Sequence, residues 1–298
     1  MVKACSGLLM LIGLIAIDLV LGQTAQIAKI GDSGGTGRYN DVAVSYPYAF
    51  CTAERNGVDI FDVTNPDQPV KIGRIPVPIA TGIAVQGTTA YIVGQGLFIY
   101  DISNPLAPVQ LFHLNDPAIP GGGWDIFVGG AMAYVVDWTT GSGLHIIDVS
   151  NPTAPVRLGG YPCDTAADVY VSGAYAYLCD YYKGCYILDI SNPQAPQLVW
   201  SHLFTESQFT DGVWVSGGRA YFLVMTSTDA QMEIWNVENP LDPQPLGSYA
   251  RPGYFDFVSV WDGTAFISAV SEFLIVNAAS PEAPVLMGAL QSPVGVSH

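Results

Sequence analysis

One short motif recurs at near-regular intervals along almost the whole chain. Its fullest form is LHIIDVSNPTAPVRLGG at residues 144–160, and its marker is an Asn-Pro or Ser-Pro pair. The intervals between successive markers are 39, 47, 41, 47 and 41 residues, and the markers begin at Asn65, Asn104, Asn151, Asn192, Asn239 and Ser280. This period is typical of four-stranded propeller blades, whereas helical repeats would bring amphipathic helices, which the chain lacks. The unbroken repeat predicts one domain.

Each repeat contains four short segments that we name strands A to D in chain order. Strand B opens with Ala followed by Tyr or Phe, strand C ends before the marker pair, and strand D follows the second Pro. The segments are rich in Val, Ile, Tyr and Phe and are bounded by Gly, Pro and Asn, as strands are. Strand A is predicted at 41–44, 82–85, 125–128, 168–171, 212–215 and 257–260.

The predicted fold class is therefore all-β, a β-propeller of four-stranded blades with six complete repeats. Several strands are apolar throughout, which suits blades that pack face to face. Residues 28–31 resemble a strand D, and residues 294–297 resemble the opening of a seventh strand A. Two readings stay open, namely partial strands of a seventh blade or a six-bladed ring with spare ends.

The full pattern, an Ala-Tyr strand followed by [LV]-x-I-x-D-V-S-N-P-x-x-P-V-x-x-G, resembles the LVIVD-repeat β-propeller family of bacterial and archaeal secreted or surface proteins. The resemblance covers nearly everything after residue 26. It implies a β-propeller in an extracellular or cell-surface setting. The family has no common catalytic motif, so the resemblance carries no site residues over to this chain.

The N-terminus has the features of a secretory signal peptide. Lys3 supplies the positive start, residues 8–21 are almost wholly apolar, and Val20-Leu21-Gly22 precede the expected cleavage. Asp18 interrupts this segment, which is also short for a membrane span, and an uncleaved anchor is the alternative. We expect a signal peptide at 1–22, a propeller domain at 23–298, a secreted or cell-surface location, and no membrane span after cleavage.

Charged residues are few and mostly acidic. The chain has 10 Lys and Arg against 26 Asp and Glu, a net charge of −16 at pH 7. Such a surface repels phosphate backbones, so we expect no nucleic-acid partner. Cations and cationic ligands fit better, although solubility alone would also explain an acidic composition. The expected partner is an extracellular protein, peptide or glycan.

The spacing of the strands divides the loops into two classes. The offset from the last Val of strand A to the first Ala of strand B is 5 residues in all six repeats, and the offset from the marker residue to the Pro of strand D is always 4. The span from that Ala to the marker varies from 14 to 19 residues. In a propeller the A–B and C–D turns share one face, and the B–C and D–A loops share the other. The second face, which we call the variable face, is therefore the expected binding face.

Aspartates are expected to collect at the variable face, because strand A is the innermost strand. The candidate ligand-binding carboxylates, each at or next to the start of a strand A, are Asp41, Asp211 and Asp256. Hairpin pairing is expected to place Asp137 beside Asp125 and Asp180 beside Asp168. Converging oxygens suit a hard cation, so these four residues are predicted to hold calcium, and no other cofactor is expected. The alternative is that the carboxylates bond backbone amides of neighbouring blades.

Aromatic residues are also expected at the variable face, where they could stack on sugars or peptide side chains. The candidate binding residues are Trp124, Trp138, Tyr181 and Tyr182, and the same loops carry Tyr39, Phe209, Tyr254 and Phe255. Packing between blades would account for some of these rings instead.

Two cysteines are predicted to form a disulfide. Cys179 and Cys185 flank residues 180–184 between strands B and C of the fourth repeat, which places them nearly opposite each other. This arrangement is compatible with disulfide geometry, and secretion would supply an oxidising compartment.

These features favour a binding module that acts through the variable face. One alternative is a carbohydrate-active or other hydrolytic enzyme that uses a pair of the central carboxylates. A second is a structural adhesion or surface-array module. No catalytic residue is assigned, because the chain has no GxSxG or HExxH motif and its four histidines are scattered.

Overall fold

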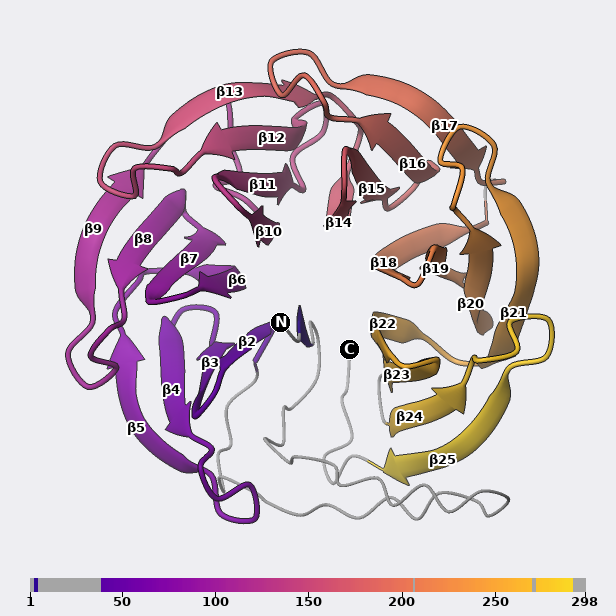
Figure 1. Cartoon of the computed structure of the whole chain (residues 1–298), viewed down its shortest axis with the longest axis horizontal. Coiled ribbons are helices and arrows are strands. Elements are labelled where there is room, and N and C mark those ends of the chain that lie inside the picture. The colour runs from indigo at the N-terminus through magenta and orange to yellow at the C-terminus, as the bar shows by residue number, and fades with distance from the viewer. Residues whose placement is uncertain (1–2, 5–38, 206, 270–271, 292–298) are drawn as a thin grey trace.

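The computed structural model describes residues 3–4, 39–205, 207–269 and 272–291, and every regular element in this part is a β-strand. Twenty-four of the strands form six antiparallel four-stranded blades arranged around a central axis (Figure 1). The predicted all-β, six-repeat propeller is therefore confirmed. The possible extra strands at 28–31 and 294–297 lie outside the described residues.

Each blade is contiguous in sequence and runs from an inner strand A to an outer strand D. Blade 1 contains β2 (Val42–Ser45), β3 (Tyr48–Thr52), β4 (Val58–Asp62) and β5 (Val70–Ile75), and blade 2 contains β6 (Ala80–Gln86), β7 (Thr89–Gly94), β8 (Leu97–Asp101) and β9 (Val109–Leu114). Blade 3 contains β10 (Asp125–Gly129), β11 (Met132–Asp137), β12 (Gly143–Asp148) and β13 (Val156–Tyr161), and blade 4 contains β14 (Ala166–Ser172), β15 (Tyr175–Asp180), β16 (Gly184–Asp189) and β17 (Gln197–Leu203). Blade 5 contains β18 (Phe209–Ser216), β19 (Arg219–Met225), β20 (Asp229–Asn236) and β21 (Gln244–Pro252), and blade 6 contains β22 (Phe255–Trp261), β23 (Thr264–Ala269), β24 (Glu272–Asn277) and β25 (Val285–Gln291).

One further strand, β1 (Lys3–Ala4), extends the first blade. It pairs antiparallel with β2, with Lys3 opposite Ala43. β1 falls within the predicted signal peptide, and the rest of that segment lies outside the described residues. No helix in the described chain is long and apolar enough to cross a membrane.

The invariant marker turn is held by the acidic or amide residue at the end of strand C. The Asp148 side chain accepts the backbone N–H of Ser150 at 2.8 Å, and Asn236 does the same for Glu238 at 2.9 Å. The equivalent bond to the residue two positions on is present in all six blades. Because an Asp or Asn oxygen caps such a turn equally well, this position belongs to the scaffold.

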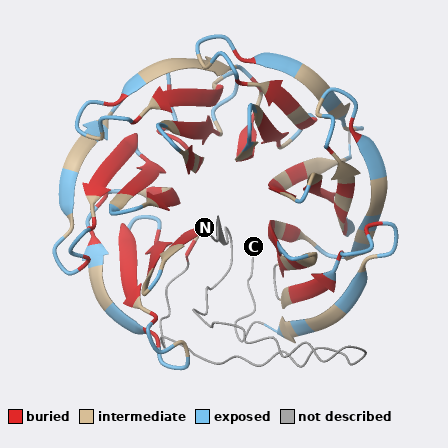
Figure 2. Cartoon of the chain, viewed as in Figure 1, coloured by how far each residue is buried: buried red, intermediate tan, exposed pale blue. Residues whose placement is uncertain are grey.

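The core lies between blades, where the apolar faces of successive sheets meet. Ile60 and Ile75 of blade 1, for example, pack with Ile83 and Val85 of blade 2. Figure 2 shows that the inner and middle strands are mostly buried, whereas the outer strands are partly exposed. Burying one such side chain stabilises the fold by about 1.5–3 kcal/mol, so each blade depends on its neighbours. This packing fixes the ends of the strands and hence the loops of the variable face.

Candidate functional site

Six aromatic rings form a continuous band at the variable face of blades 3 to 6. We call this band the aromatic arc, and its members are Trp124, Trp138, Tyr181, Tyr182, Phe209 and Tyr254. The ring centroids are 5.0 Å apart for Trp124 and Trp138, 4.9 Å for Trp138 and Tyr181, and 4.7 Å for Tyr181 and Tyr182. From Tyr181 the band continues to Phe209 at 5.2 Å and then to Tyr254 at 5.7 Å. Such spacings are those of favourable aromatic pairs.

Strand ends hold the rings of the arc in place. Trp124 lies immediately before β10 and Trp138 immediately after β11, and the Trp124 N–H donates to the Val136 carbonyl at 2.7 Å. Tyr181 lies in the turn between β15 and β16. Its N–H donates to the Thr165 carbonyl at 2.8 Å, and its carbonyl accepts the N–H of Thr210 in blade 5 at 3.1 Å. The arc is therefore carried by hydrogen-bonded backbone across a blade boundary.

The arc ends on a carboxylate. The Tyr254 hydroxyl donates to Oδ2 of Asp211 at 2.8 Å. Burial, reinforced by the nearby charge of Asp125, raises the pKa of Asp211 to about 6, although the bond from Tyr254 opposes this shift. At the other side of the arc the side chains reach solvent, since Tyr182 is 64% exposed and Trp124 is 37% exposed.

The structure thus brings together all four aromatic residues singled out from the sequence. Phe209 and Tyr254, from the same loops, join them, whereas Tyr39 and Phe255 do not. Tyr39 is buried in blade 1 with its hydroxyl on Asp59, and Phe255 is a core residue. Ligand binding by the arc stays a prediction.

Two of the predicted site aspartates connect neighbouring blades. Asp41 accepts the N–H of Val42 at 2.7 Å and, through its other oxygen, the N–H of Ile83 in blade 2 at 2.8 Å. Asp168 accepts the N–H groups of Val169 and of Val213 in blade 5 at 2.7 and 2.8 Å. Both carboxylates are buried. For Asp41 and Asp168, these contacts match the alternative given by the sequence, in which the carboxylates bond backbone amides of neighbouring blades.

The four aspartates predicted to bind calcium are not gathered into one group. Asp125 pairs with Val136 and Asp168 with Cys179, so Asp137 and Asp180 are each one residue out of register. A one-residue offset places side chains on opposite faces of a sheet, which makes the expected side-by-side placement wrong. In the part of the chain that is described, no group of three or more His, Cys, Asp or Glu side chains is suited to a metal ion.

Asp137 and Asp180 instead hold loop backbone. Asp137 accepts the N–H groups of Gly121 at 3.0 Å and Thr139 at 2.9 Å. Asp180 accepts those of Asp164 at 2.8 Å and Thr165 at 3.3 Å. Both carboxylates therefore shape the loops that carry the arc.

The two cysteines predicted to pair are directly opposite each other in the register of β15 and β16. Both are buried free thiols, so the disulfide is not formed in the structure. Burial raises the pKa of Cys179, and the Thr210 hydroxyl lies 3.3 Å from its sulfur. The thiol therefore stays protonated at neutral pH, which makes it a weak nucleophile.

Blade 3 contains a serine–histidine contact that the sequence did not reveal, because Ser142 and His145, although three residues apart, match no catalytic motif. Nε2 of His145 is 2.9 Å from the Ser142 hydroxyl, which is 3.1 Å from Oδ2 of Asp137. Nε–H of Arg157 donates to Nδ1 of His145 at 3.1 Å. Since arginine can only donate, Nε2 must carry the imidazole proton and donate to Ser142. The imidazole therefore cannot accept the serine proton, as nucleophilic catalysis would require.

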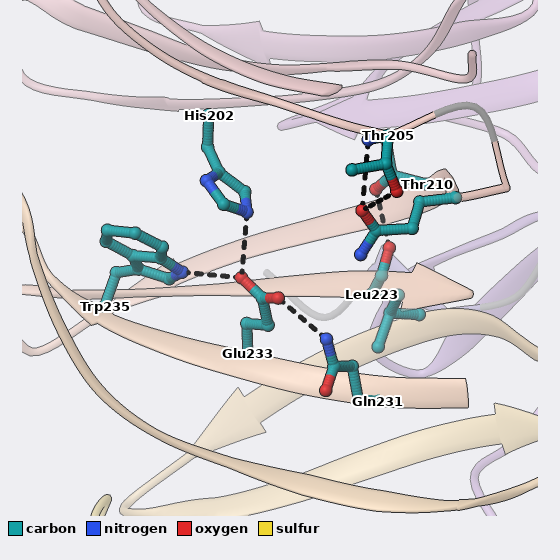
Figure 3. A network of polar contacts seen from close by, with 8 residues as sticks. His202, Thr205, Thr210, Leu223, Gln231, Glu233 and Trp235 are labelled. Carbon is teal, nitrogen blue, oxygen red and sulfur yellow. Dashed lines mark hydrogen bonds and ion pairs between the residues drawn. The ribbon is translucent and has the colours of Figure 1, made fainter. Parts of the chain in front are cut away.

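A second aromatic cluster joins blades 4 and 5 near the rim (Figure 3). Glu233 accepts the indole N–H of Trp235 at 3.0 Å and the amide of Gln231 at 2.8 Å, all from β20. Nε2 of His202, from β17, approaches the same carboxylate at 3.7 Å. Trp200 packs on Trp235 with the ring centroids 5.0 Å apart. Because both oxygens of Glu233 already accept hydrogen bonds, we interpret this cluster as a link between blades.

Comparison with known proteins supports the fold. The family model for the LVIVD repeat matches residues 36–76, 79–116, 120–162 and 164–203, more than half of the chain. No curated protein matches the sequence.

Similar solved structures include a periplasmic gluconolactonase from Pseudomonas aeruginosa, with 9% identity, a TM-score of 0.71, and coverage of 91% of this chain and 90% of that one. A hypothetical selenium-binding protein from Sulfolobus tokodaii has 10% identity and a TM-score of 0.67, with 84% of this chain and 75% of that one covered. The β-propeller domain of Swd1 from Myceliophteria thermophila has 12% identity and a TM-score of 0.64, with 87% of each chain covered. At such identities the likeness shows the fold alone.

Proposed function

The chain belongs to the LVIVD-repeat family, and on that premise we propose that it is a secreted or cell-surface binding module whose ligand site is the aromatic arc. The carboxylates of Asp125, Asp211 and Asp256 form the polar side of this site. The ligand is an extracellular protein, peptide or glycan. The repeats build the scaffold, and the loops of the variable face supply the contacts.

The observation that carries the proposal is the aromatic arc itself. Six rings from four blades are in contact, with Tyr182 branching from Tyr181. Trp138, Tyr181, Phe209 and Tyr254 are partly buried and also pack against the cores between blades, so the exposed part of the arc is made by Trp124 and Tyr182. An exposed ring such as Tyr182 or Trp124 leaves apolar surface in water, which gives no stability to the free protein. Clustered exposed aromatic surface is characteristic of binding sites.

The extracellular location rests on the N-terminal sequence and on the family resemblance. It is tested by expressing the full chain in a host with a secretory pathway and sequencing the N-terminus of the exported protein. The expected first residue is Gln23. Retention of the whole product inside the cell, with Met1 intact, would contradict the location.

Binding is tested by applying the purified protein to arrays of glycans and peptides. The ligands retained by the wild type are then titrated against Tyr182→Ala and Trp124→Ala. Loss of an exposed stacking ring should weaken affinity by about tenfold. The matched control is Trp261→Ala, because Trp261 is exposed beside the two-residue turn of blade 6 on the opposite face. Equal loss in the control, or unchanged binding in both arc variants, would refute the site.

A further inference from the structure

The arrangement of charge around the aromatic arc points to the chemistry of its ligand. Resting on the proposed function, we infer that the arc binds a basic peptide, with the stem of a lysine or arginine side chain against the rings and its charged group at Asp125, Asp211 and Asp256. The proposal stands on where the rings and the carboxylates lie, on the charge around them, and on donor–acceptor matching.

Rings and carboxylates are close in sequence where the inner strands begin. Trp124 directly precedes Asp125, and Tyr254 lies two residues before Asp256. Asp211, on β18 with Phe209, is bonded to the Tyr254 hydroxyl of the neighbouring blade at 2.8 Å. Asp125 opens β10 directly after Trp124, and Asp256 is the second residue of β22, which follows Tyr254. The three carboxylates therefore lie at the variable-face ends of the inner strands that adjoin the arc.

The charge around the arc favours a cation. Lys183 follows Tyr182 directly, but its ammonium pairs with Asp164 at 3.1 Å. Arg251, near the start of the Tyr254 loop, pairs with Glu272 at 2.7 Å. The whole chain has a net charge of −16, so these paired cations leave an acidic field that attracts basic ligands.

Hydrogen-bonding capacity distinguishes a basic side chain from a neutral sugar. Ionised carboxylates only accept hydrogen bonds, whereas an ammonium or guanidinium group only donates them. Sugar hydroxyls both donate and accept, so a set of carboxylates satisfies them incompletely. Aromatic faces also attract cations, most strongly for tryptophan, and cover the apolar stems of lysine and arginine. A basic side chain therefore matches both halves of the site.

The test uses a fluorescent peptide of alternating lysine and glycine and the same peptide with every lysine acetylated. Affinity is measured by anisotropy with the full mature protein between about 20 and about 300 mM NaCl. We expect the lysine peptide to bind at least about tenfold more tightly than the acetylated one, and its affinity to fall as salt rises. Asp211→Asn should weaken this binding by about five- to tenfold. Asp67→Asn, which removes an exposed aspartate on the opposite face, should leave it unchanged.

Equal binding of the two peptides, or equal affinities of the Asp211→Asn and Asp67→Asn proteins for the lysine peptide, would overturn the inference. Asp256→Asn serves in the same comparison if circular dichroism shows that Asp211→Asn does not fold. The binding role of the arc and the basic nature of its ligand can be tested separately. If Tyr182→Ala weakens a salt-independent interaction with a neutral glycan, the arc is a binding site but the ligand is not cationic.

Discussion

Aspartates perform different tasks in this protein, and three of these tasks can be compared directly. Those that end strand C, such as Asp148, cap a turn. Those that open strand A, such as Asp168, connect two blades through buried hydrogen bonds. Asp211, by contrast, lies partly buried beside the aromatic arc with a raised pKa. The same residue type is scaffold in the first two places and a candidate ligand group in the third.

The scaffold roles predict unequal effects of the same substitution. In Asp168→Asn the amide nitrogen would face one of the two backbone N–H groups, so one buried bond is lost, and we expect a loss of roughly 1–3 kcal/mol in the free energy of unfolding. Asp189→Asn should cost less than about 0.5 kcal/mol, because Asn236 and Asn277 fill the same turn position in blades 5 and 6. Denaturant unfolding of both variants measures the difference. Equal costs would mean that the contact between blades 4 and 5 contributes nothing.

Asp211 predicts a distinctive dependence of stability on pH. Its pKa is raised from about 3.8 to about 6, so between these values the folded state binds more protons than the unfolded state. The contribution of this group to stability therefore falls as pH rises from about 4 to about 6. Asp211→Asn removes the effect and should be more stable than the wild type at pH 7 by roughly 1–2 kcal/mol, with the difference vanishing near pH 4.

Urea unfolding of both proteins at several pH values tests this prediction. His145 makes the opposite contribution, because burial and Arg157 lower its pKa to about 4 and stability is lost as pH falls from about 6.5. The comparison of Asp211→Asn with the wild type cancels that term, since both proteins keep His145. A pH-independent difference between them would show that Asp211 titrates normally.

At the scale of strands and turns, constant spacing explains what the sequence predicts well. An offset of 5 residues between strands A and B fits a two-residue hairpin, and such a turn pairs Val171 with Ala176. The sequence does not show the irregularity between Ala166 and Asp168, which shifts the register beyond it. Counting from the turn itself already places Cys179 opposite Asp168, and Val136 opposite Asp125 in blade 3, so the expected pairings with Asp180 and Asp137 are one residue too far along strand B. Contacts between blades, such as Tyr254 with Asp211, join residues too far apart in sequence for any local pattern to show.

The hairpins also predict which turn residues can be replaced. Gly173 has a φ of +60°, and a Cβ added there would meet nothing within 4 Å, so conformation rather than space limits the position. Gly173→Val should cost about 1–2 kcal/mol, because a branched side chain disfavours this region. Gly173→Asp should cost less, since Asp262 adopts a φ of 46° in the turn of blade 6. Thermal denaturation of both variants would contradict the account if Asp were the worse replacement.

For the whole molecule, the excess of acidic groups opposes the compact state. Described cations such as Lys71 and Arg74, which both pair with Asp59 at 2.6 Å, are already engaged. Added salt should therefore screen the remaining repulsion between carboxylates more than it weakens these pairs. We expect the melting temperature at pH 7 to rise by roughly 2–4 °C between low salt and about 0.5 M NaCl. A fall would mean that the ion pairs outweigh the repulsion.

The carboxylates of Asp41 and Asp168 also restrict the order of the blades, because each needs a matching amide in the blade that follows it. Each reaches forward into the next blade, and both receiving strands carry a glycine at the matching position, Gly82 and Gly212. If blade 1 were separated from blade 2, or blade 4 from blade 5, a buried carboxylate would lose its hydrogen bond from the backbone N–H of the next blade. Such a loss is costly. Blades 1 and 2 (β2–β9), and likewise blades 4 and 5 (β14–β21), should therefore be kept together when blades are exchanged. We expect propellers in which one blade of such a pair is replaced alone to fold less well than propellers in which both blades are replaced together.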